Sequence, residues 1–155
     1  MRSHEEVKRK RDKILEQVDE NIDSRYAERN SRMTPAEFYF VLDRSGSMAG
    51  TPIRVALDAL RLFIRSLPSG SRFNVISFGS EFTSMFESPV EYTKANIKIA
   101  LEELSTFKAN MAGTEIYQPL QNIFTSKSTS ALKKYVYLIT DGGVTNEADV
   151  VKLIE

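Results

Sequence analysis

Carboxylate and hydroxyl side chains at separate places in the sequence form a set of candidate ligands for a hard cation. The set contains only oxygen ligands, and its members are Asp43, Ser45, Ser47, Thr114 and Asp141. Magnesium prefers such ligands, and manganese and calcium are the alternatives. Two aspartates brought together would repel each other unless a cation or a shared proton neutralised them. Two aspartates just balance the charge of a divalent ion, and the hydroxyl ligands add no negative charge. The ion would therefore remain attractive to one further anion, such as a carboxylate of a partner.

Two apolar runs in the sequence place the aspartates. Residues 38–42 are all apolar or aromatic and lead into Asp43, and residues 135–139 lead through Thr140 into Asp141. Unbroken apolar runs are typical of strands buried on both faces, as in a parallel sheet covered by helices. Ligands of such sheets bind at the carboxyl ends of the strands, which is where both aspartates would lie.

Strand and helix patterns alternate along the chain. The other predicted elements are a helix from Thr51-Pro52 through residues 53–67, a strand over 72–78, a short strand over 82–86, a helix capped by Thr93, a helix over 116–124 and a last helix that starts at residues 145–146. Thr51 is a candidate helix cap, and the short connection at 79–81 suits an antiparallel edge strand. The alternation predicts an α/β fold with a doubly wound, mostly parallel sheet in the order 3-2-1-4 and one antiparallel edge strand. In this order the two apolar strands are neighbours, so Asp43 and Asp141 converge.

Residues 1–33 differ from the rest of the chain in composition. Apolar residues recur at helical spacing among many charges, so we predict a charged helical N-terminal segment before a domain over residues 34–155. The narrow apolar stripe would pack on the domain, pair with another helix, or stand alone as a linker. Acidic residues surround the basic run at 8–11, which favours a solvated helix face over a localisation or phosphate-binding patch.

Composition excludes several classes of function. Lys plus Arg and Asp plus Glu are both 21, so no overall charge favours nucleic acid or an anionic membrane. The chain has no cysteine and its single histidine is His4, which argues against thiolate metal sites and a Ser-His-Asp triad. No secretory signal or stretch of bilayer length is recognised, so no membrane insertion is predicted. The absence of cysteine favours a reducing compartment, and we expect a cytoplasmic protein.

The three oxygen-bearing loops resemble the metal-ion-dependent adhesion site (MIDAS) of von Willebrand factor A domains. The first loop of that site reads Asp-x-Ser-x-Ser, and residues 43–47 read Asp-Arg-Ser-Gly-Ser; the other loops correspond to Thr114 and to residues 140–142, Thr-Asp-Gly. The resemblance covers residues 36–155. Residues 111–116, Met-Ala-Gly-Thr-Glu-Ile, are similar to the subgroup found in inter-alpha-trypsin-inhibitor heavy chains and their cysteine-poor intracellular relatives.

The resemblance implies a Rossmann-like fold and a non-enzymatic module that binds other proteins. Carried over residue by residue, it implies that Ser45, Ser47 and, depending on state, Thr114 bind a magnesium ion directly. Asp43 and Asp141 would bind mainly through water. In this family the metal typically bridges to a glutamate or aspartate of another protein, and this is the partner that we expect.

The family's domain normally continues through two more strands and a final helix, so we interpret residues 34–155 as a C-terminally incomplete domain. The strand over 135–139 would then present an unpaired apolar edge, which favours association. We expect this edge to be covered by self-association, by exchange of an element or by the N-terminal helix, so that homo-oligomers form through the edge or through that helix.

Two other functions stay open from the sequence alone. A magnesium-dependent phosphoryl-transfer enzyme would use Asp43 as its nucleophile. Phosphatases of that kind carry a second aspartate two residues later, where this chain has Ser45, and no Gly-Lys pair of the Walker type is present. A scaffold with a vestigial metal site would use Asp43 to cap a turn and the serines to bond to backbone. Arg44 flanks the ligands and is a candidate contact for an acidic partner.

Overall fold

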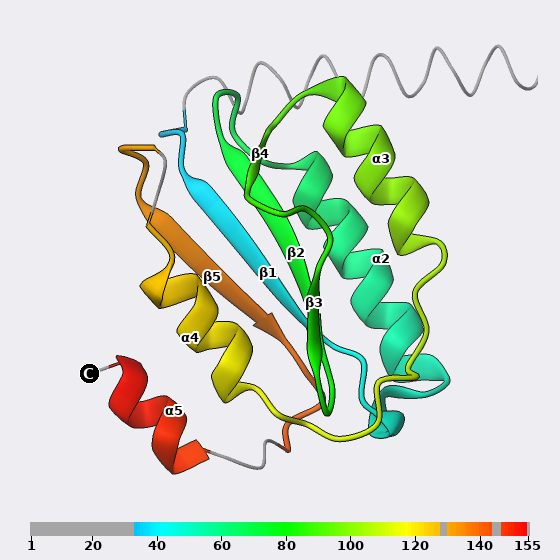
Figure 1. The fold of residues 1–155 in the computed structure, drawn as a ribbon. Helices are drawn as coiled ribbons and strands as arrows, with labels where there is room; N and C mark the ends of the chain where they lie inside the picture. Colours follow the sequence, from blue (N-terminus) through cyan, green and yellow to red (C-terminus); the bar gives the residue numbers. More distant parts are fainter. Residues whose placement is uncertain (1–32, 128–129, 144–146, 155) are drawn as a thin grey trace, which may run out of the picture.

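A β-sheet with helices on both faces organises this chain (Figure 1). The structure is a computed structural model that describes residues 33–127, 130–143 and 147–154, so the predicted N-terminal helix lies outside the described residues. The strands are β1 (Glu37–Asp43), β2 (Arg72–Phe78), β3 (Phe82–Ser84), β4 (Val90–Glu91) and β5 (Lys134–Ile139). The helices are the 3₁₀ turn η1 (Gly46–Met48), α2 (Thr51–Arg65), α3 (Lys94–Leu104), α4 (Tyr117–Thr125) and α5 (Glu147–Ile154).

The strand order is β3-β2-β1-β5, and β4 also pairs with β2. β1 lies between two parallel neighbours, with Glu37 opposite Arg72 on β2 and opposite Lys134 on β5. β3 runs antiparallel to β2. The predicted order 3-2-1-4 is confirmed, because β5 is the fourth of the predicted strands. β4 was not predicted, since a strand of 2 residues carries no readable alternation.

β1 and β5 differ in burial, although both were predicted to be buried strands. Every residue of β1 is buried. β5 pairs with β1 alone among the described strands, and its Tyr135, Tyr137 and Leu138 are 41%, 43% and 45% exposed. The prediction of a strand buried on both faces is therefore wrong for the described part of the chain, whereas the unpaired apolar edge predicted for residues 135–139 agrees with the position of β5 at the end of the described sheet.

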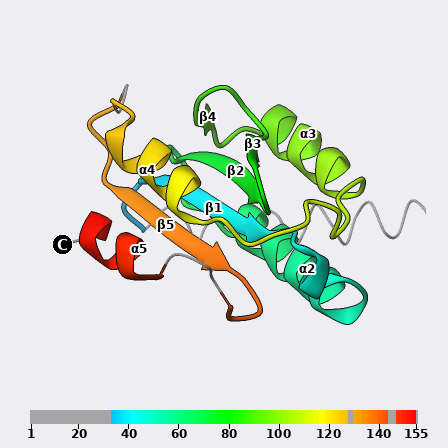
Figure 2. The same ribbon diagram turned by 60° about the horizontal axis from the view of Figure 1, so that its bottom comes forward.

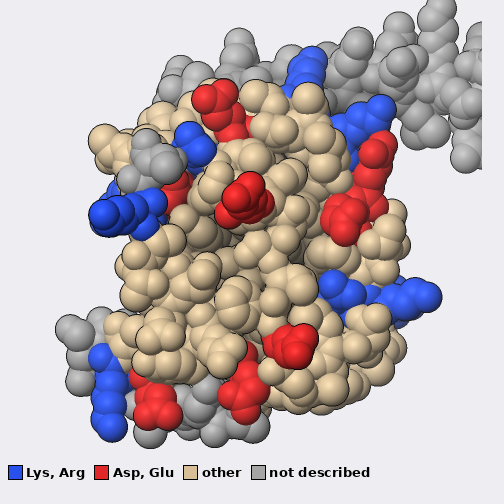
Figure 3. All heavy atoms as spheres, in the orientation of Figure 1, with Lys and Arg blue, Asp and Glu red and all other residues tan. Residues whose placement is uncertain are grey.

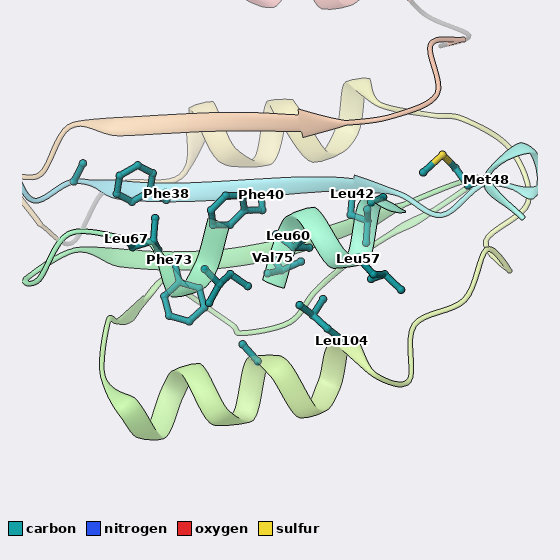
Figure 4. Packing of buried hydrophobic residues seen from close by; sticks show 14 residues of the cluster. Phe38, Phe40, Leu42, Met48, Leu57, Leu60, Leu67, Phe73, Val75 and Leu104 are labelled. Atoms are coloured by element: carbon teal, nitrogen blue, oxygen red, sulfur yellow. The ribbon is translucent and has the colours of Figure 1, made fainter. Parts of the chain in front are cut away.

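The sheet has helices on both faces (Figures 1 and 2), and a hydrophobic layer lies between each face and its helices. α2 and α3 cover one face, where Leu60, Phe73 and Leu104 are fully buried (Figure 4). α4 and α5 cover the other face, where Ile116 and Ile123 pack against strand residues. Helices on both faces are what a doubly wound sheet requires, so the predicted architecture is confirmed.

α2 presents an apolar side to the sheet, as its spacing predicts. The residues that it buries are Ala56, Leu57, Leu60 and Ile64. Phe63 was predicted on the same side but is 43% exposed. Its ring stacks on the rings of Phe40 and Tyr137, with centroids 6.2 Å apart in both pairs. Phe63 therefore lies at the border of the layer, next to the edge strand.

The two predicted helix caps have different outcomes. α2 starts at Thr51 itself, with Gly50 at φ 82° in the N-cap position, so the predicted threonine cap is wrong there. Glycine accepts this backbone conformation at little cost. The cap of α3 is confirmed, because the Thr93 hydroxyl accepts a hydrogen bond from the Asn96 amide at 3.2 Å.

A buried acid, Glu37, lies at the start of β1, at the end of the strand far from the predicted metal ligands. Its carboxylate accepts hydrogen bonds from the Tyr39 hydroxyl at 2.9 Å and from the Ser130 hydroxyl at 3.1 Å. The Arg72 Nε atom lies 3.9 Å from the same carboxylate. Burial, reinforced by the contact with Glu37, raises the pKa of Tyr39 to about 12.

The charges on the surface are mixed in sign. On the face shown in Figure 3, acidic and basic side chains are interspersed and neither sign forms a continuous patch. This distribution agrees with the equal totals of 21 basic and 21 acidic residues. Within the described ranges, no helix is both long and apolar enough to cross a bilayer.

Candidate functional site

Asp43, the last residue of β1, is held at the carboxyl end of the sheet. Its side chain is 0% exposed. One carboxylate oxygen, Oδ1, accepts a hydrogen bond from the Ser45 amide at 2.8 Å. The other, Oδ2, accepts one from the Thr140 hydroxyl at 2.8 Å. The carboxylate therefore joins the loop after β1 to the residue that follows β5.

The hydroxyls of Ser45 and Ser47 lie next to each other in the loop after β1. Their Oγ atoms are 3.0 Å apart. Ser45 is 2% exposed, whereas Ser47 is exposed to solvent. η1 begins directly after Ser45, and its Met48 is buried in the layer under α2. The loop thus presents a pair of hydroxyl oxygens, one from the interior and one from the surface.

The loop that carries Thr114 is attached to the loop after β1 by backbone hydrogen bonds. The Met111 amide donates to the Arg44 carbonyl at 3.0 Å, and the Gly46 amide donates to the Ala112 carbonyl at 3.0 Å. Ala112 has φ 62°, a left-handed conformation that is uncommon outside glycine. Thr114, which is partly buried, follows two residues later. Ligands predicted from distant parts of the sequence therefore come from segments in direct contact.

The residues after β2 hold the same loop from its other side. The Ser80 amide donates to the Met111 carbonyl at 2.7 Å, and the Ser80 hydroxyl accepts from the Gly113 amide at 2.8 Å. The Glu115 amide donates to the Gly79 carbonyl at 2.7 Å. A Cβ atom on Gly79 would lie 2.0 Å from the Met111 carbonyl oxygen. A glycine is therefore required at position 79 for the two loops to approach this closely.

Asp141 lies at the same end of the sheet, one residue after Thr140. Its side chain is exposed. The next residue, Gly142, has φ 122°, and its amide donates to the Thr140 hydroxyl oxygen at 3.3 Å. Figure 1 shows that β1 and β5 both run toward this end of the sheet. The loop between α3 and α4 crosses the same end. Asp141 is thus placed by Thr140, whose hydroxyl bonds to Asp43.

The predicted ligands fall into two groups in the structure. Hydrogen bonds within the loop after β1 connect Asp43, Ser45 and Ser47. Thr114 and Asp141 lie in two other loops. Hydrogen bonds of Met111 and Ala112 attach the Thr114 loop to the loop after β1, and the hydrogen bond of Thr140 attaches the Asp141 loop to Asp43. The described residues contain no group of three or more His, Cys, Asp or Glu side chains that could hold a metal ion. The candidate set differs from such groups, because it contains only two carboxylates and depends on hydroxyls.

Arg44 makes contacts that the sequence did not predict. As a candidate contact for an acidic partner it stays a prediction, and in the structure its guanidinium contacts the loop between α3 and α4. Nε donates to the Lys108 carbonyl at 2.8 Å, and Nη2 donates to the Asn110 side-chain oxygen at 2.9 Å. The group also lies 4.2 Å from the centroid of the Phe107 ring. Burial lowers the pKa of Arg44, and the charge of Glu103 opposes this shift.

Two residues that shape the site had no predicted role. Thr140 was part of the recognised motif, but its hydrogen bond to Asp43 was not anticipated. The available signal was a hydroxyl residue between an apolar run and Asp141. For Gly79, the signal was a glycine directly after a predicted strand, which is a position where another backbone often approaches closely.

The comparison with protein families agrees with this fold. The family model of the von Willebrand factor type A domain matches residues 36–155. Von Willebrand factor A domain-containing protein 5A of Homo sapiens is 37% identical over 128 residues, which cover 77% of this chain and 16% of that protein. A von Willebrand factor A domain-containing protein of Dictyostelium discoideum is 36% identical over 119 residues, which cover 77% of this chain and 13% of that protein. The chain therefore spans only a small part of these relatives.

Solved structures with lower sequence identity share the fold. A von Willebrand factor type A protein from Catenulispora acidiphila superposes with a TM-score of 0.66 at 22% identity, over 78% of this chain and 30% of that one. Proximal thread matrix protein 1 from the mussel byssus, solved with a zinc-occupied MIDAS motif, gives a TM-score of 0.58 at 21% identity, over 73% of this chain and 30% of that one.

Proposed function

Since this chain belongs to the von Willebrand factor type A domain family, we propose that it binds other proteins through a divalent cation at the carboxyl end of its sheet. Magnesium is the proposed ion, with manganese or calcium as alternatives. The proposed ligands are Asp43, Ser45, Ser47, Thr114 and Asp141. The proposed partner is a protein that offers a glutamate or aspartate side chain to the remaining coordination position.

The spacing of the two serine hydroxyls is the observation that carries this proposal. Adjacent oxygen ligands of an octahedral magnesium ion lie about 2.9 Å apart when each Mg–O distance is about 2.0–2.1 Å. The Oγ atoms of Ser45 and Ser47 are 3.0 Å apart, which fits this edge of an octahedron. The hydroxyl oxygens of Ser45 and Ser47 are also hard ligands, which magnesium prefers. The residues therefore fit the ion that the family implies.

The hydrogen bonds of Asp43 support a role that is mainly indirect. Both of its carboxylate oxygens already accept hydrogen bonds at 2.8 Å, from the Ser45 amide and the Thr140 hydroxyl. These contacts fix the carboxylate and leave its negative charge to attract a cation through a bridging water. A bound cation would supply the positive centre that attracts a partner's carboxylate. Asp43 would supply charge, and the serines would supply direct contacts.

The relatives support the coarse function, and one structural neighbour supports the metal. The curated relatives are named as von Willebrand factor A domain-containing proteins. A zinc-occupied MIDAS motif in the mussel protein supports a metal-binding role for this kind of site. Membership of the inter-alpha-trypsin-inhibitor heavy-chain subgroup stays a prediction based on residues 111–116. Self-association through the edge of β5 or through the N-terminal segment also stays a prediction.

We propose that the chain is not an enzyme. The phosphoryl-transfer alternative needs Asp43 as a nucleophile, but this carboxylate is fully buried and both of its oxygens are engaged in hydrogen bonds. A second aspartate two residues later would also be needed, and that residue is Ser45. None of the comparisons supports this alternative.

Calorimetry with matched serine variants tests the proposal. Magnesium is titrated into chelator-treated protein, and Ser47→Ala is compared with Ser84→Ala, because both serines are exposed but Ser84 lies on β3. We expect the wild type and Ser84→Ala to bind magnesium with equal affinity and Ser47→Ala to bind at least about tenfold more weakly. No heat from the wild type, or equal affinities in all three proteins, would leave the vestigial scaffold as the better description.

A second arm of the experiment addresses the partner. Peptide pairs that differ only by glutamate or glutamine at one position are screened in magnesium and in chelator. We expect binding that requires both magnesium and the acidic member of a pair. Equal binding of both members would contradict recognition of a carboxylate.

A further inference from the structure

Arg44 connects the two loops that carry the proposed hydroxyl ligands. It stands between Asp43 and Ser45 in the sequence, and its side chain reaches the loop before Thr114. We propose that Arg44 is a positioning residue, which fixes the Thr114 loop against the Ser45–Ser47 pair and so raises the affinity for the cation. This inference rests on the proposed function, because it concerns the same metal site.

The side chain of Arg44 uses all three of its nitrogen atoms. Nε donates to the Lys108 carbonyl at 2.8 Å and Nη2 to the Asn110 side-chain oxygen at 2.9 Å. Nη1 makes a longer contact of 3.5 Å with the Ser77 hydroxyl on β2. The guanidinium carbon lies 4.2 Å from the centre of the Phe107 ring. One planar group therefore holds a loop backbone, a loop side chain and a ring in fixed relative positions.

The backbone of Arg44 binds neighbours on both sides. Its amide donates to the Phe78 carbonyl at 2.9 Å, and its carbonyl accepts from the Met111 amide at 3.0 Å. The first bond attaches Arg44 to the end of β2, and the second attaches it to the Thr114 loop. The side chain of Arg44 thus holds the loop at Lys108 and Asn110, and its backbone holds the same loop at Met111.

The part of the loop nearest to Thr114 has its own contacts, which predict the size of the effect. Gly113 and Glu115 are bonded to Ser80 and Gly79. Removing the Arg44 side chain would therefore loosen residues 107–110 without releasing the whole loop. Residues that orient metal ligands from outside the coordination sphere typically change metal affinity by about 10–100-fold when mutated. We expect a loss at the lower end of this range.

Lysine cannot replace arginine in this arrangement. A guanidinium presents its donors in a rigid planar fork, whereas the lysine ammonium is a single point on a flexible stem. Arg44→Lys would keep the charge and lose the simultaneous contacts with Lys108 and Asn110. Its magnesium affinity should lie between those of the wild type and Arg44→Ala. An affinity of Arg44→Lys equal to that of the wild type would show that charge alone matters and would overturn the positioning role.

A double-mutant cycle separates positioning from general stability. Magnesium affinity is measured for Arg44→Ala, Thr114→Ala and the double variant, with Arg61→Ala on α2 as the control, because Arg61 pairs with Asp58 away from the loops. We expect Arg44→Ala to weaken magnesium about tenfold. Thr114→Ala should then reduce the magnesium affinity by a clearly smaller factor in the Arg44→Ala background than in the wild type. The control should show no coupling with Thr114, and additive losses for Arg44 and Thr114 would overturn the inference.

Amide hydrogen exchange in chelator gives a readout without any metal. Arg44→Ala and Asn110→Ala should both speed the exchange of the Met111 amide, while the amide of Ile76 in β2 keeps its protection. Asn110→Ala removes a single exposed acceptor, so it tests the contact in a folded protein even if Arg44→Ala unfolds. Unchanged exchange at Met111 in both variants would overturn the inference. If the wild type binds no magnesium but exchange at Met111 rises as expected, the proposed function fails while the link between the loops stands.

Discussion

Replacing Thr140 by valine tests whether the hydroxyl after β5 supports the buried carboxylate at the end of β1. Valine keeps the branched shape of threonine and removes the donor that lies 2.8 Å from Asp43 Oδ2. Because Asp43 is 0% exposed, water cannot readily replace that donor. The loss of a hydrogen bond to a buried charged group costs about 1.5–3 kcal/mol. We therefore expect the free energy of unfolding to fall by about 2 kcal/mol.

Urea denaturation in chelator measures this effect without a contribution from metal binding, which would stabilise the folded state. With a dependence on urea of about 2 kcal/mol per molar, the midpoint should fall by about 1 M. Thr140→Ser is the matched control, because it keeps the hydroxyl and loses only a methyl group; its midpoint should stay closer to that of the wild type. The reasoning would be refuted if the urea midpoint of Thr140→Val equalled that of the wild type. It would also be refuted if the midpoint of Thr140→Val fell by no more than that of Thr140→Ser.

Two further changes test the loop contact and the buried tyrosine. Gly79→Ala should lower the free energy of unfolding by about 1–3 kcal/mol, because its Cβ would lie 2.0 Å from the Met111 carbonyl oxygen; Gly46→Ala, with open space around it, is the control in thermal unfolding, and equal melting temperatures would contradict the prediction. Folding raises the pKa of Tyr39 from 10.0 to about 12, so the protonated tyrosine contributes to the free energy of unfolding. This contribution should be fully present below pH 10.0 and lost as the pH rises to about 12. In denaturant titrations between about pH 9 and pH 12, the free energy of unfolding should fall less for Tyr39→Phe than for the wild type. An equal fall in the two proteins would disprove the prediction.

The fold could be predicted from the sequence because its main elements carry strong periodic signals. β1 is an unbroken apolar run, and the buried side of α2 recurs at helical spacing. Alternating strands and helices leave few topologies, and the order found for β3, β2, β1 and β5 is the common one. The apolar run of β5 alone does not show whether the strand has one neighbour or two, so its exposed edge was predicted only from the resemblance to the family.

The predicted site residues could be named from their types and spacing, but the contacts around them could not. Asp43 and Thr140 are 97 positions apart, and Arg44 and Asn110 are 66 positions apart. Such contacts depend on the way distant loops meet, and no local pattern encodes them. The contacts of Arg44 with the loop before Thr114 could not be predicted for this reason, because the sequence shows only that the arginine stands beside candidate ligands.

The division of the interior by the sheet has a consequence for how the protein tolerates substitution. Leu60 and Leu104 belong to one layer, and Ile116 and Ile123 belong to the other. Side chains on opposite faces of a sheet share few neighbours, and the effects of distant substitutions without shared partners usually add. Each layer can therefore be repacked with little compensation in the other. The backbone of β1, which both layers cover, is the part of the protein where their adjustments meet.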